Sequence, residues 1–293
     1  MLKIACIPAY NEEAVITDVI KRALKYVDKV VVCDDGSSDK TYTRSKDAGA
    51  IVIKHEEKLG KGAAMKSLFK YAKDSEADVV VTIDGDGQFM PEEIPKLVLP
   101  ILENKSDIVI GYRFDDKEEM PTYRKIGNKV LDKMTNVASN LPFKDTQSGF
   151  RAYSKKAINL IDFKTDGFGA DSEILVDASH KGLKIIEEKV TVLYNTGNKT
   201  STKNPISHSV EVVSSLIELI AIRYPLRYLG IPGLILMIIG VVFAITTISI
   251  FNETRYFSIP STLISIGTTL VGLMFLLMSV VLFSISRILR RIP

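Results

Sequence analysis

The sequence predicts an α/β fold with a mainly parallel, Rossmann-like sheet, followed by a pair of membrane-spanning helices. Over residues 1–204, short β-branched segments alternate with helical segments, the pattern of a parallel sheet covered by helices on both faces. Residues 230–251 and 259–286 contain no charged side chain, and each segment exceeds the roughly 20 residues that span a bilayer. With 46% hydrophobic and 25% charged residues, the chain has a globular composition and not a disordered one.

The elements of the expected sheet follow one another in a regular order. Apolar runs bounded by turn residues predict strands at residues 2–7, 30–33, 51–53, 79–83 and 108–112. Helices are expected at residues 12–26, 39–48 and 61–75, the last because Ala64, Leu68 and Tyr71 have helical spacing. A sheet of this kind binds ligands beyond the carboxyl ends of its strands, so functional residues are expected there.

The two charge-free segments predict a transmembrane hairpin. Only residues 252–258 connect them, and both segments are too long and too far along the chain for a signal peptide. The alternative, a pair of buried helices in a soluble core, fits these lengths less well. Arginines precede and follow the hairpin, at Arg223, Arg227, Arg287, Arg290 and Arg291. By the positive-inside tendency, the large domain and both ends of the chain are expected in the cytoplasm.

The chain is expected to divide into three parts. Residues 1–204 form the large domain, residues 205–228 an amphipathic helix, and residues 229–293 the hairpin with a short basic tail. The helix is expected because apolar residues recur at helical spacing from Ile206 to Ile220, while Glu211 and Glu218 lie elsewhere on its surface. It lies on the membrane or packs on the domain, and the sequence leaves both arrangements open.

Charge and cysteine content exclude several classes of protein. Lys and Arg total 38 against 35 Asp and Glu, a net charge of +3, so no nucleic-acid partner is expected. The two cysteines, Cys6 and Cys33, exclude a disulfide framework and a four-cysteine zinc site, and both are expected to be small buried residues. The absence of a Gly-x-Ser-x-Gly elbow argues against a serine hydrolase.

Polar motifs follow three of the expected strands. They are Pro8-Ala9-Tyr10-Asn11-Glu12, the run Asp-Asp-Gly-Ser-Ser-Asp at residues 34–39, and Asp84-Gly85-Asp86-Gly87-Gln88. Turn chemistry alone explains part of this pattern, and Asp39 is expected to cap the following helix. The adjacent Asp34 and Asp35 repel each other unless a cation or hydrogen-bond donors lie nearby, which favours a functional site.

The third motif has the composition of a site for a hard divalent cation. It does not continue as an EF-hand, because Phe89 and Pro95 stand where that pattern needs Gly and Glu. Two carboxylates and an amide oxygen suit Mg²⁺ or Mn²⁺, whose coordination phosphate oxygens often complete. The sequence therefore predicts a phosphate-containing ligand bound together with a divalent cation.

Taken together, the motifs resemble those of family 2 of the nucleotide-sugar glycosyltransferases, and within it the polyprenyl-phosphate hexose synthases. The resemblance rests on the three motifs above, on Leu59-Gly60-Lys61-Gly62, on Gly111-Tyr112-Arg113 and on residues 145–151. It covers residues 3–194 and is strongest in the nucleotide-binding half. It implies a GT-A fold, an inverting transfer, and Mg²⁺ or Mn²⁺ on the donor diphosphate.

The resemblance also assigns residues to roles. The donor would be bound by Pro8, Tyr10, Glu12, Asp35, Lys61, Asp84 and Gly85, and the metal by Asp86 and Gln88. The catalytic residues would be Asp86, Arg113, Arg124 and Arg151. The acceptor phosphate would be bound by Arg113, Arg124, Ser148 and Lys199. For each arginine the alternative is a surface ion pair.

The chemistry of the acceptor decides whether a general base is needed. Family members that glycosylate a hydroxyl use a carboxylate base, and Asp171 and Glu173 lie in the corresponding part of this chain. A phosphate monoester has a second pKa of about 6, so near pH 7 it already presents an anionic oxygen. We therefore expect Asp171 to be dispensable for the chemistry. The alternative is that Asp171 caps a helix that begins near Ser172.

The expected function is the transfer of a hexose from a nucleotide sugar to dolichyl or another polyprenyl phosphate at the cytosolic membrane face. The form of residues 145–151 slightly favours UDP-glucose or UDP-N-acetylglucosamine over GDP-mannose. One alternative is transfer to a hydroxyl of a glycolipid or polysaccharide; processive synthases carry a Gln-x-x-Arg-Trp motif, and this chain has no Trp. Another is a non-catalytic, membrane-anchored subunit that binds nucleotide sugars, which the intact Asp84, Asp86 and Gln88 disfavour.

Overall fold

The computed structural model describes residues 1–113, 131–133, 135–136, 138–139, 141–167, 169–193 and 225–289. The chain forms two compact units, Met1–Leu216 and Ile217–Pro293, and each is described by itself. Arg124, Lys199 and most of the expected amphipathic helix at residues 205–228 lie outside the described residues. The three-part division of the chain therefore stays a prediction.

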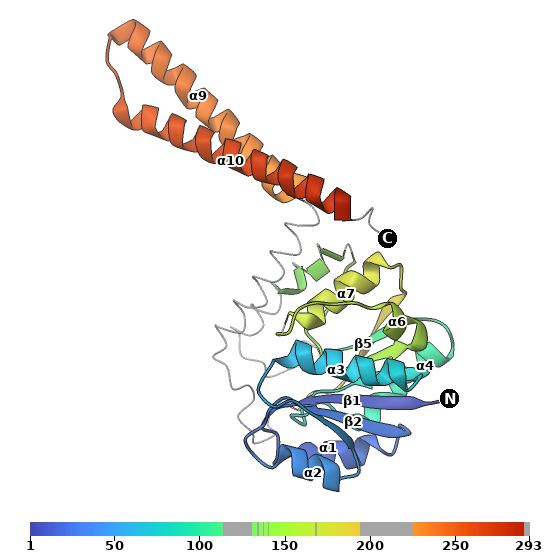
Figure 1. Cartoon of the computed structure of the whole chain (residues 1–293). Helices are drawn as coiled ribbons and strands as arrows, with labels where there is room; N and C mark the ends of the chain where they lie inside the picture. The colour runs from blue at the N-terminus through green and yellow to red at the C-terminus, as the bar shows by residue number, and fades with distance from the viewer. Residues whose placement is uncertain are drawn as a thin grey trace. The chain divides into compact units, whose positions relative to one another are not determined.

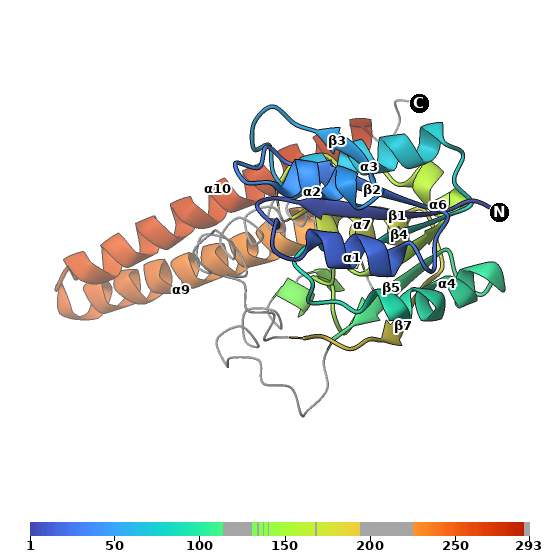
Figure 2. The same cartoon turned by 90° about the horizontal axis from the view of Figure 1, so that it is seen from below.

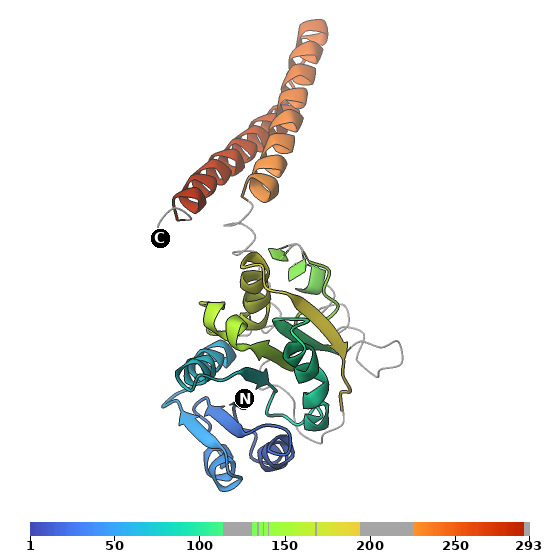
Figure 3. The ribbon, with the colours of Figure 1, turned by 90° about the vertical axis from the view of Figure 1, so that its right-hand side faces the viewer.

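The first unit is built on one sheet, which has seven strands in the described residues, in the order β3-β2-β1-β4-β6-β5-β7. The strands are β1 (Lys3–Ala9), β2 (Lys29–Asp34), β3 (Ile51–Lys54), β4 (Val79–Thr82), β5 (Ile108–Tyr112), β6 (Arg151–Ser154) and β7 (Ile185–Lys189). The pairs among β1, β2, β3 and β4 are parallel, as is the pair of β5 and β7. In Figure 3, β7, drawn yellow-brown, lies at the opposite edge of the sheet from the blue strands.

β6 is the exception in this parallel sheet. It lies between β4 and β5 and runs antiparallel to both. Neither β6 nor β7 was expected from the sequence, because β6 begins inside a segment interpreted only as a motif and β7 ends in the charged run Glu187-Glu188-Lys189. The expectation of a mainly parallel α/β sheet is confirmed, with one reversed strand at its centre.

Helices cover both faces of the sheet (Figures 1 and 2). The helices are α1 (Ile16–Ala23), α2 (Thr41–Asp47), α3 (Lys61–Asp74), α4 (Ile94–Leu102), α6 (Lys155–Leu160) and α7 (Ala170–His180). α1 and α4 pack on one face, into a core that includes Ile7 and Val81, and α3, α6 and α7 pack on the other, around Cys6 and Val80. Successive side chains along a strand thus pack into opposite cores, because side chains alternate between the two faces of a sheet.

Two local predictions need correction. The helix expected at residues 12–26 is only Ile16–Ala23, because Glu12 and its neighbours form a turn in which the Glu12 carbonyl accepts from Val15 and Ile16. Asp39 lies one residue before the N-cap position of α2, yet its carboxylate accepts hydrogen bonds from the Thr41 amide and hydroxyl. Asp39 therefore stabilises the start of α2 without being its formal cap.

The second unit is a helical hairpin. After one π-helical turn at Leu226–Gly230, α9 (Ile231–Thr254) and α10 (Ile259–Leu289) lie side by side (Figure 1). Leu226–Thr254 and Ile259–Ile285 are long and apolar enough to cross a membrane, with mean hydropathies of 2.8 and 2.4. Only 11% of an 18-residue apolar stretch in each span is buried, so most apolar side chains there face outward, as a lipid environment requires.

Small and hydroxylated residues bring the two helices of the hairpin together. A methyl group on Gly233 or Gly272 would collide with the backbone of the other helix, so these glycines permit the close approach. Ser265 Oγ donates to the Gly240 carbonyl at 2.8 Å, and the Thr247 and Ser261 hydroxyls are 2.7 Å apart. Such interhelical hydrogen bonds hold helices together where the surrounding lipid supplies no hydrophobic driving force.

Candidate active site

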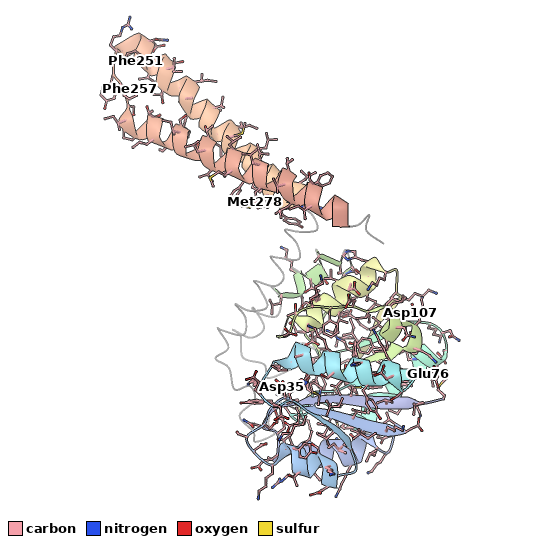
Figure 4. The ribbon with its side chains drawn as sticks, in the orientation of Figure 1. Asp35, Glu76, Asp107, Phe251, Phe257 and Met278 are labelled. Atoms are coloured by element: carbon pink, nitrogen blue, oxygen red, sulfur yellow. The ribbon has the colours of Figure 1, made fainter. Side chains whose placement is uncertain are left out.

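The polar motifs meet at the carboxyl edge of the parallel strands. β1 leads into Tyr10 and Glu12, β2 into Asp35, β4 into Asp84, and β5 into Arg113. In Figure 4, Asp35 marks this edge, and Glu76 and Asp107 lie at the other end of the sheet. The segments that follow strands far apart in the sequence are thus brought to one place, as expected of a doubly wound sheet.

Carboxylates crowd this edge. Burial, followed by the charge of Asp84, raises the pKa of Asp86 to about 6. Burial, followed by the charges of Asp86, Asp84 and Asp39, raises the pKa of Glu12 to about 7. Burial is the larger cause of both shifts, and the neighbouring carboxylates add a repulsion that the binding of a cation would relieve.

The residues expected to bind a metal suit a cation that is held partly by the protein and partly by a phosphate-containing ligand. Asp84 and Asp86 offer hard carboxylate oxygens, and the backbone N–H of Gln88 donates to Asp86 Oδ1 at 3.0 Å, which stabilises the turn from Asp86 to Gln88. Within the described residues, no three His, Cys, Asp or Glu side chains converge closely enough to hold a metal ion by themselves. The donor set suits Mg²⁺ or Mn²⁺ bound through one or two carboxylates together with phosphate oxygens.

Lys61 connects the acidic motif to α7. Its ammonium lies 2.9 Å from Asp84 Oδ1 and 2.9 Å from Asp171 Oδ2. Burial by itself would lower the pKa of Lys61, but the charges of Asp171 and Asp84 outweigh burial and raise it above its usual range. The structure therefore brings the predicted donor-binding residue Lys61 into the site as a permanent cation between two carboxylates.

Asp171 is not a helix cap. It lies in the first turn of α7, two residues after the N-cap Gly169, and its carboxylate pairs with Lys61. The capping interpretation of Asp171 is therefore wrong, because the helix begins earlier than expected. The second base candidate, Glu173, accepts hydrogen bonds from the Lys164 and Thr165 amides at 3.0 and 2.9 Å, which gives it a structural role in this loop.

Asp34 and Asp35 are stabilised by hydrogen-bond donors of the chain itself. Asp34 Oδ1 accepts from the Ser37 amide, and Asp35 accepts from the Leu59 and Gly60 amides at 3.0 and 2.8 Å. His55 Nδ1 also lies 2.8 Å from Asp35 Oδ1. Asp35, expected to bind the nucleoside, is only 4% exposed and holds the loop that leads to Lys61.

The segment after β1 forms the other wall of the site. Tyr10 is capped by the Lys58 ammonium, 3.4 Å from the centre of its ring. Asn11 adopts a left-handed backbone conformation with φ of 57°, and its amide donates to the Ser37 hydroxyl. The structure thus places Tyr10 and Glu12 beside the loop after β2. Pro8 belongs to β1, and its carbonyl lies against Gly85.

The arginine and serine side chains expected to be catalytic or to bind the acceptor phosphate lie at different depths. Arg113 forms a bidentate ion pair with the buried Asp145, at 2.7 and 2.9 Å, and its side chain remains 15% exposed. Arg151 is wholly buried and donates to the carbonyls of Asp171 and Thr146. Ser148 is also buried and donates to the Gly111 carbonyl. A direct contact of Arg151 or Ser148 with a phosphate would require the structure to rearrange.

Two residues that support the site, Asp145 and His55, were not predicted from the sequence. Asp145 belongs to a motif that was recognised, but no pattern indicates that its carboxylate is buried against Arg113. His55 carries no motif, and only its place between Asp35 and Ser67 shows that it supports the loop before Lys61. Both relations join residues far apart in the chain, so spacing does not reveal them.

Comparison with known proteins identifies the family. The model of glycosyl transferase family 2 matches residues 4–161, more than half of the chain. The chain belongs to glycosyl transferase family 2. This glycosyltransferase has the GT-A fold, a Rossmann-like sheet with a reversed strand, followed by two candidate membrane-spanning helices.

Named relatives of this glycosyltransferase act on dolichyl phosphate. The UDP-N-acetylglucosamine–dolichyl-phosphate N-acetylglucosaminyltransferase of Methanococcus voltae is 33% identical over 211 residues, covering 64% of this chain and 84% of the relative. The dolichol-phosphate mannosyltransferase of Pyrococcus furiosus is 33% identical over 202 residues, covering 63% and 54%. Glucosyl-3-phosphoglycerate synthase from Mycobacterium tuberculosis, solved with Mn²⁺, UDP and phosphoglyceric acid, superposes with a TM-score of 0.59 at 22% identity, covering 74% of this chain and 78% of that one.

Proposed function

We propose that this glycosyltransferase transfers a sugar from a nucleotide sugar to a polyprenyl phosphate, such as dolichyl phosphate, with inversion at the anomeric carbon. The observation that carries the proposal is the joining, in one chain, of an acidic GT-A site and two candidate membrane-spanning helices. Relatives named for dolichyl phosphate support the choice of acceptor. The product is a lipid-linked sugar that can serve as a donor in glycan assembly.

The donor is proposed to bind across the acidic edge. Tyr10 and Glu12 line the nucleoside side, and Asp84 and Lys61 face the diphosphate. Asp86 and Gln88 would hold Mg²⁺ or Mn²⁺, and this ion, when bound, supplies the positive charge that stabilises the leaving nucleoside diphosphate. A UDP-sugar is preferred in this proposal, because a relative of 33% identity is named for UDP-N-acetylglucosamine.

The acceptor is proposed to enter near Arg113. A phosphate monoester needs cations to hold it in line with the anomeric carbon, and it needs no general base. Arg113 is held by Asp145 and partly exposed, and Arg124 and Lys199 are proposed to complete the acceptor site. The base candidate Asp171 already shares its charge with Lys61, which agrees with an acceptor that arrives deprotonated.

The hairpin is proposed to keep the site at the cytosolic face of the membrane. A polyprenyl phosphate keeps its chain in the bilayer and its phosphate at the interface, so an anchored enzyme meets it there. Phe251, Tyr256 and Phe257 cluster at the connection between α9 and α10 and are exposed, as expected of aromatic residues at a membrane surface (Figure 4 labels Phe251 and Phe257). In this orientation, that connection lies on the far side of the membrane from the site.

One experiment tests the proposal. The full chain, purified in detergent, is incubated with Mn²⁺, a polyprenyl phosphate and UDP-glucose, UDP-N-acetylglucosamine or GDP-mannose, and the lipid products are identified by mass. We expect a polyprenyl phosphate extended by one sugar, and a loss of about a thousandfold or more in Asp86→Asn. Transfer to a polyprenol or glycolipid hydroxyl alone would support the alternative acceptor. Nucleotide-sugar binding without any transfer would support a binding subunit.

A further inference from the structure

Lys61 stands between two carboxylates that belong to different parts of the fold. It is the first residue of α3, Asp84 follows β4, and Asp171 lies in the first turn of α7. Both ion pairs measure 2.9 Å, and the side chains of Lys61 and Asp171 are only 16% and 7% exposed. Asp84 is more open, with 26% of its side chain exposed, so a cation can approach it from its free side.

Both ends of this bridge are fixed by the fold. The carbonyl of Asp171 accepts a hydrogen bond from the buried Arg151 at 2.8 Å, which holds the start of α7. A methyl group on Gly62 would collide with the Thr165 carbonyl, so α3 begins in tight contact with the loop before α7. The backbones that carry Lys61 and Asp171 are therefore both held in place, which fixes the ammonium against Asp171.

The charges around Asp84 put Lys61 in competition with a divalent cation. Glu12 and Asp86 add negative charge beside Asp84, and Lys61 and Arg113 are the cations that act on Asp86. An ammonium paired with Asp84 alone would hold that carboxylate strongly and weaken its interaction with a second cation. Asp171 takes part of the ammonium's attraction and adds a negative charge of its own.

We propose that Asp171 is a positioning residue that acts through Lys61: by sharing the Lys61 ammonium with Asp84, it sets the affinity of the Asp84–Asp86 motif for its divalent cation. The inference rests on the proposed function only in taking this motif as the cation site. It gives Asp171 a role other than the general base and other than the helix cap. It also assigns a role to Arg151, which holds the Asp171 backbone through a hydrogen bond to its carbonyl.

Charge substitutions at the two residues have opposite expected effects. Asp171→Asn removes a negative charge and leaves Lys61 paired with Asp84 alone, so Mn²⁺ binds more weakly, by about three- to tenfold. Lys61→Met removes the competing cation, so Mn²⁺ binds more tightly by a similar factor. The double variant Lys61→Met/Asp171→Asn loses one charge of each sign and returns close to the affinity of the unmodified protein.

In the test, the full chain in detergent is titrated with Mn²⁺ alone, and electron paramagnetic resonance measures the concentration of free Mn²⁺ at each step. The matched control is Lys66→Met, which removes another lysine of α3, paired with Asp166 at 2.7 Å and 36% exposed. We expect this control to leave Mn²⁺ affinity unchanged. Asp171→Glu, which keeps the charge, is expected to keep most of the affinity.

Several outcomes would overturn the inference. They are an unchanged Mn²⁺ affinity in folded Asp171→Asn, shifts of the same sign in the two single variants, or an equal shift in Lys66→Met. If Asp171→Asn does not fold, Lys61→Met still tests the competition that the inference requires, and unchanged or weaker Mn²⁺ binding by Lys61→Met would overturn it. Since the titration contains neither sugar nor acceptor, failure to transfer to a polyprenyl phosphate would refute the proposed function and leave this result intact.

Discussion

Burial and neighbouring carboxylates raise the pKa of Glu12, and this determines how the protein responds to pH. Its ordinary value is 4.5 and its value in the folded protein is about 7. An acid with a higher pKa in the folded state holds its proton more tightly there, so its contribution to stability is present below the unfolded value. That contribution is lost as pH rises through the folded value.

The first prediction follows from this sign. The metal-free protein is expected to lose thermal stability as pH rises from about 4.5 to about 7, and Glu12→Gln is expected to reduce this dependence, to which Asp86 also contributes. The measurement is thermal unfolding in detergent with a chelator at a series of pH values. Glu103→Gln, at an exposed residue paired with Lys105, should keep the original slope. If thermal stability depends on pH in Glu12→Gln as it does in the unmodified protein, the raised pKa of Glu12 is contradicted.

A second prediction concerns the pair of Arg113 and Asp145. Because Asp145 is wholly buried, Arg113→Ala leaves its carboxylate without a counter-charge and is expected to destabilise the protein by about 3–5 kcal/mol. Arg113→Lys keeps the charge but loses the bidentate geometry, and it is expected to fold while transferring sugar poorly. Thermal unfolding and transfer rates of both variants separate the two effects. Full transfer by Arg113→Lys would exclude a role for its planar geometry at the acceptor.

For single residues, the chemistry of the site could be predicted from the sequence better than the contacts between side chains could. The Asp84-x-Asp86 spacing and Gln88 indicate a divalent-cation site because these residues are adjacent in the chain. The bridge from Lys61 to Asp171 and the pair of Arg113 with Asp145 connect residues far apart, and their strength depends on burial. A charged residue type is visible in a sequence, but whether its charge lies in water or against another buried group is decided by packing.

Among the elements of the fold, β6 and the segment before it position the acidic motif. The Thr82 hydroxyl of β4 donates to the Gly149 carbonyl at 2.8 Å, which ties this segment to the strand that carries Asp84. A methyl group on Gly149 would collide with both carboxylate oxygens of Asp84. The absence of a side chain at residue 149 therefore allows Asp84 to reach Lys61.

The third prediction uses this contact. Gly149→Ala is expected to push Asp84 away from Lys61 and to weaken Mn²⁺-dependent UDP binding by tenfold or more, in a protein that still folds (about 1.4 kcal/mol). Calorimetric titration with UDP and Mn²⁺ measures the loss. Gly182→Ala is the control, since a methyl group on Gly182 would meet no atom within 4 Å. Because Gly182 has a φ of 67°, this variant should lose some stability and keep UDP binding. Equal UDP affinity in the two variants would refute the prediction.

The elements themselves were predictable where the pattern was local. Five short apolar segments predicted the first five strands, because each lies between turns. β6 and β7 were missed, since Arg151 in β6 is a buried arginine and β7 ends in charged residues, so neither has the composition of a buried strand. Tertiary contacts outweigh local preference at these two strands.

For the whole molecule, the fourth prediction concerns the two units. All proposed donor residues belong to Met1–Leu216. A chain that ends at residue 223 is therefore expected to keep UDP and Mn²⁺ affinity within about twofold, but to turn over polyprenyl phosphate in vesicles at least tenfold more slowly, because the acceptor is no longer held nearby. A short-chain, soluble polyprenyl phosphate is the control substrate and should be used equally by both proteins. Equal rates on vesicles would show that the hairpin does not serve acceptor access.

The reversed direction of β6 has a consequence for engineering. Since β5 and β6 are antiparallel neighbours, with Ile110 opposite Arg151, the chain between them leaves and returns at one edge of the sheet, at two adjacent points. An exchange of this connection therefore has to satisfy those two anchor points and to keep the contact of Gly149 with Asp84 and the ion pair of Asp145 with Arg113, whereas a change in its length alone carries a small entropic cost. Every proposed donor residue lies before this connection, so exchanging it between family members with Gly149 retained offers a route to new acceptors with the same nucleotide sugar.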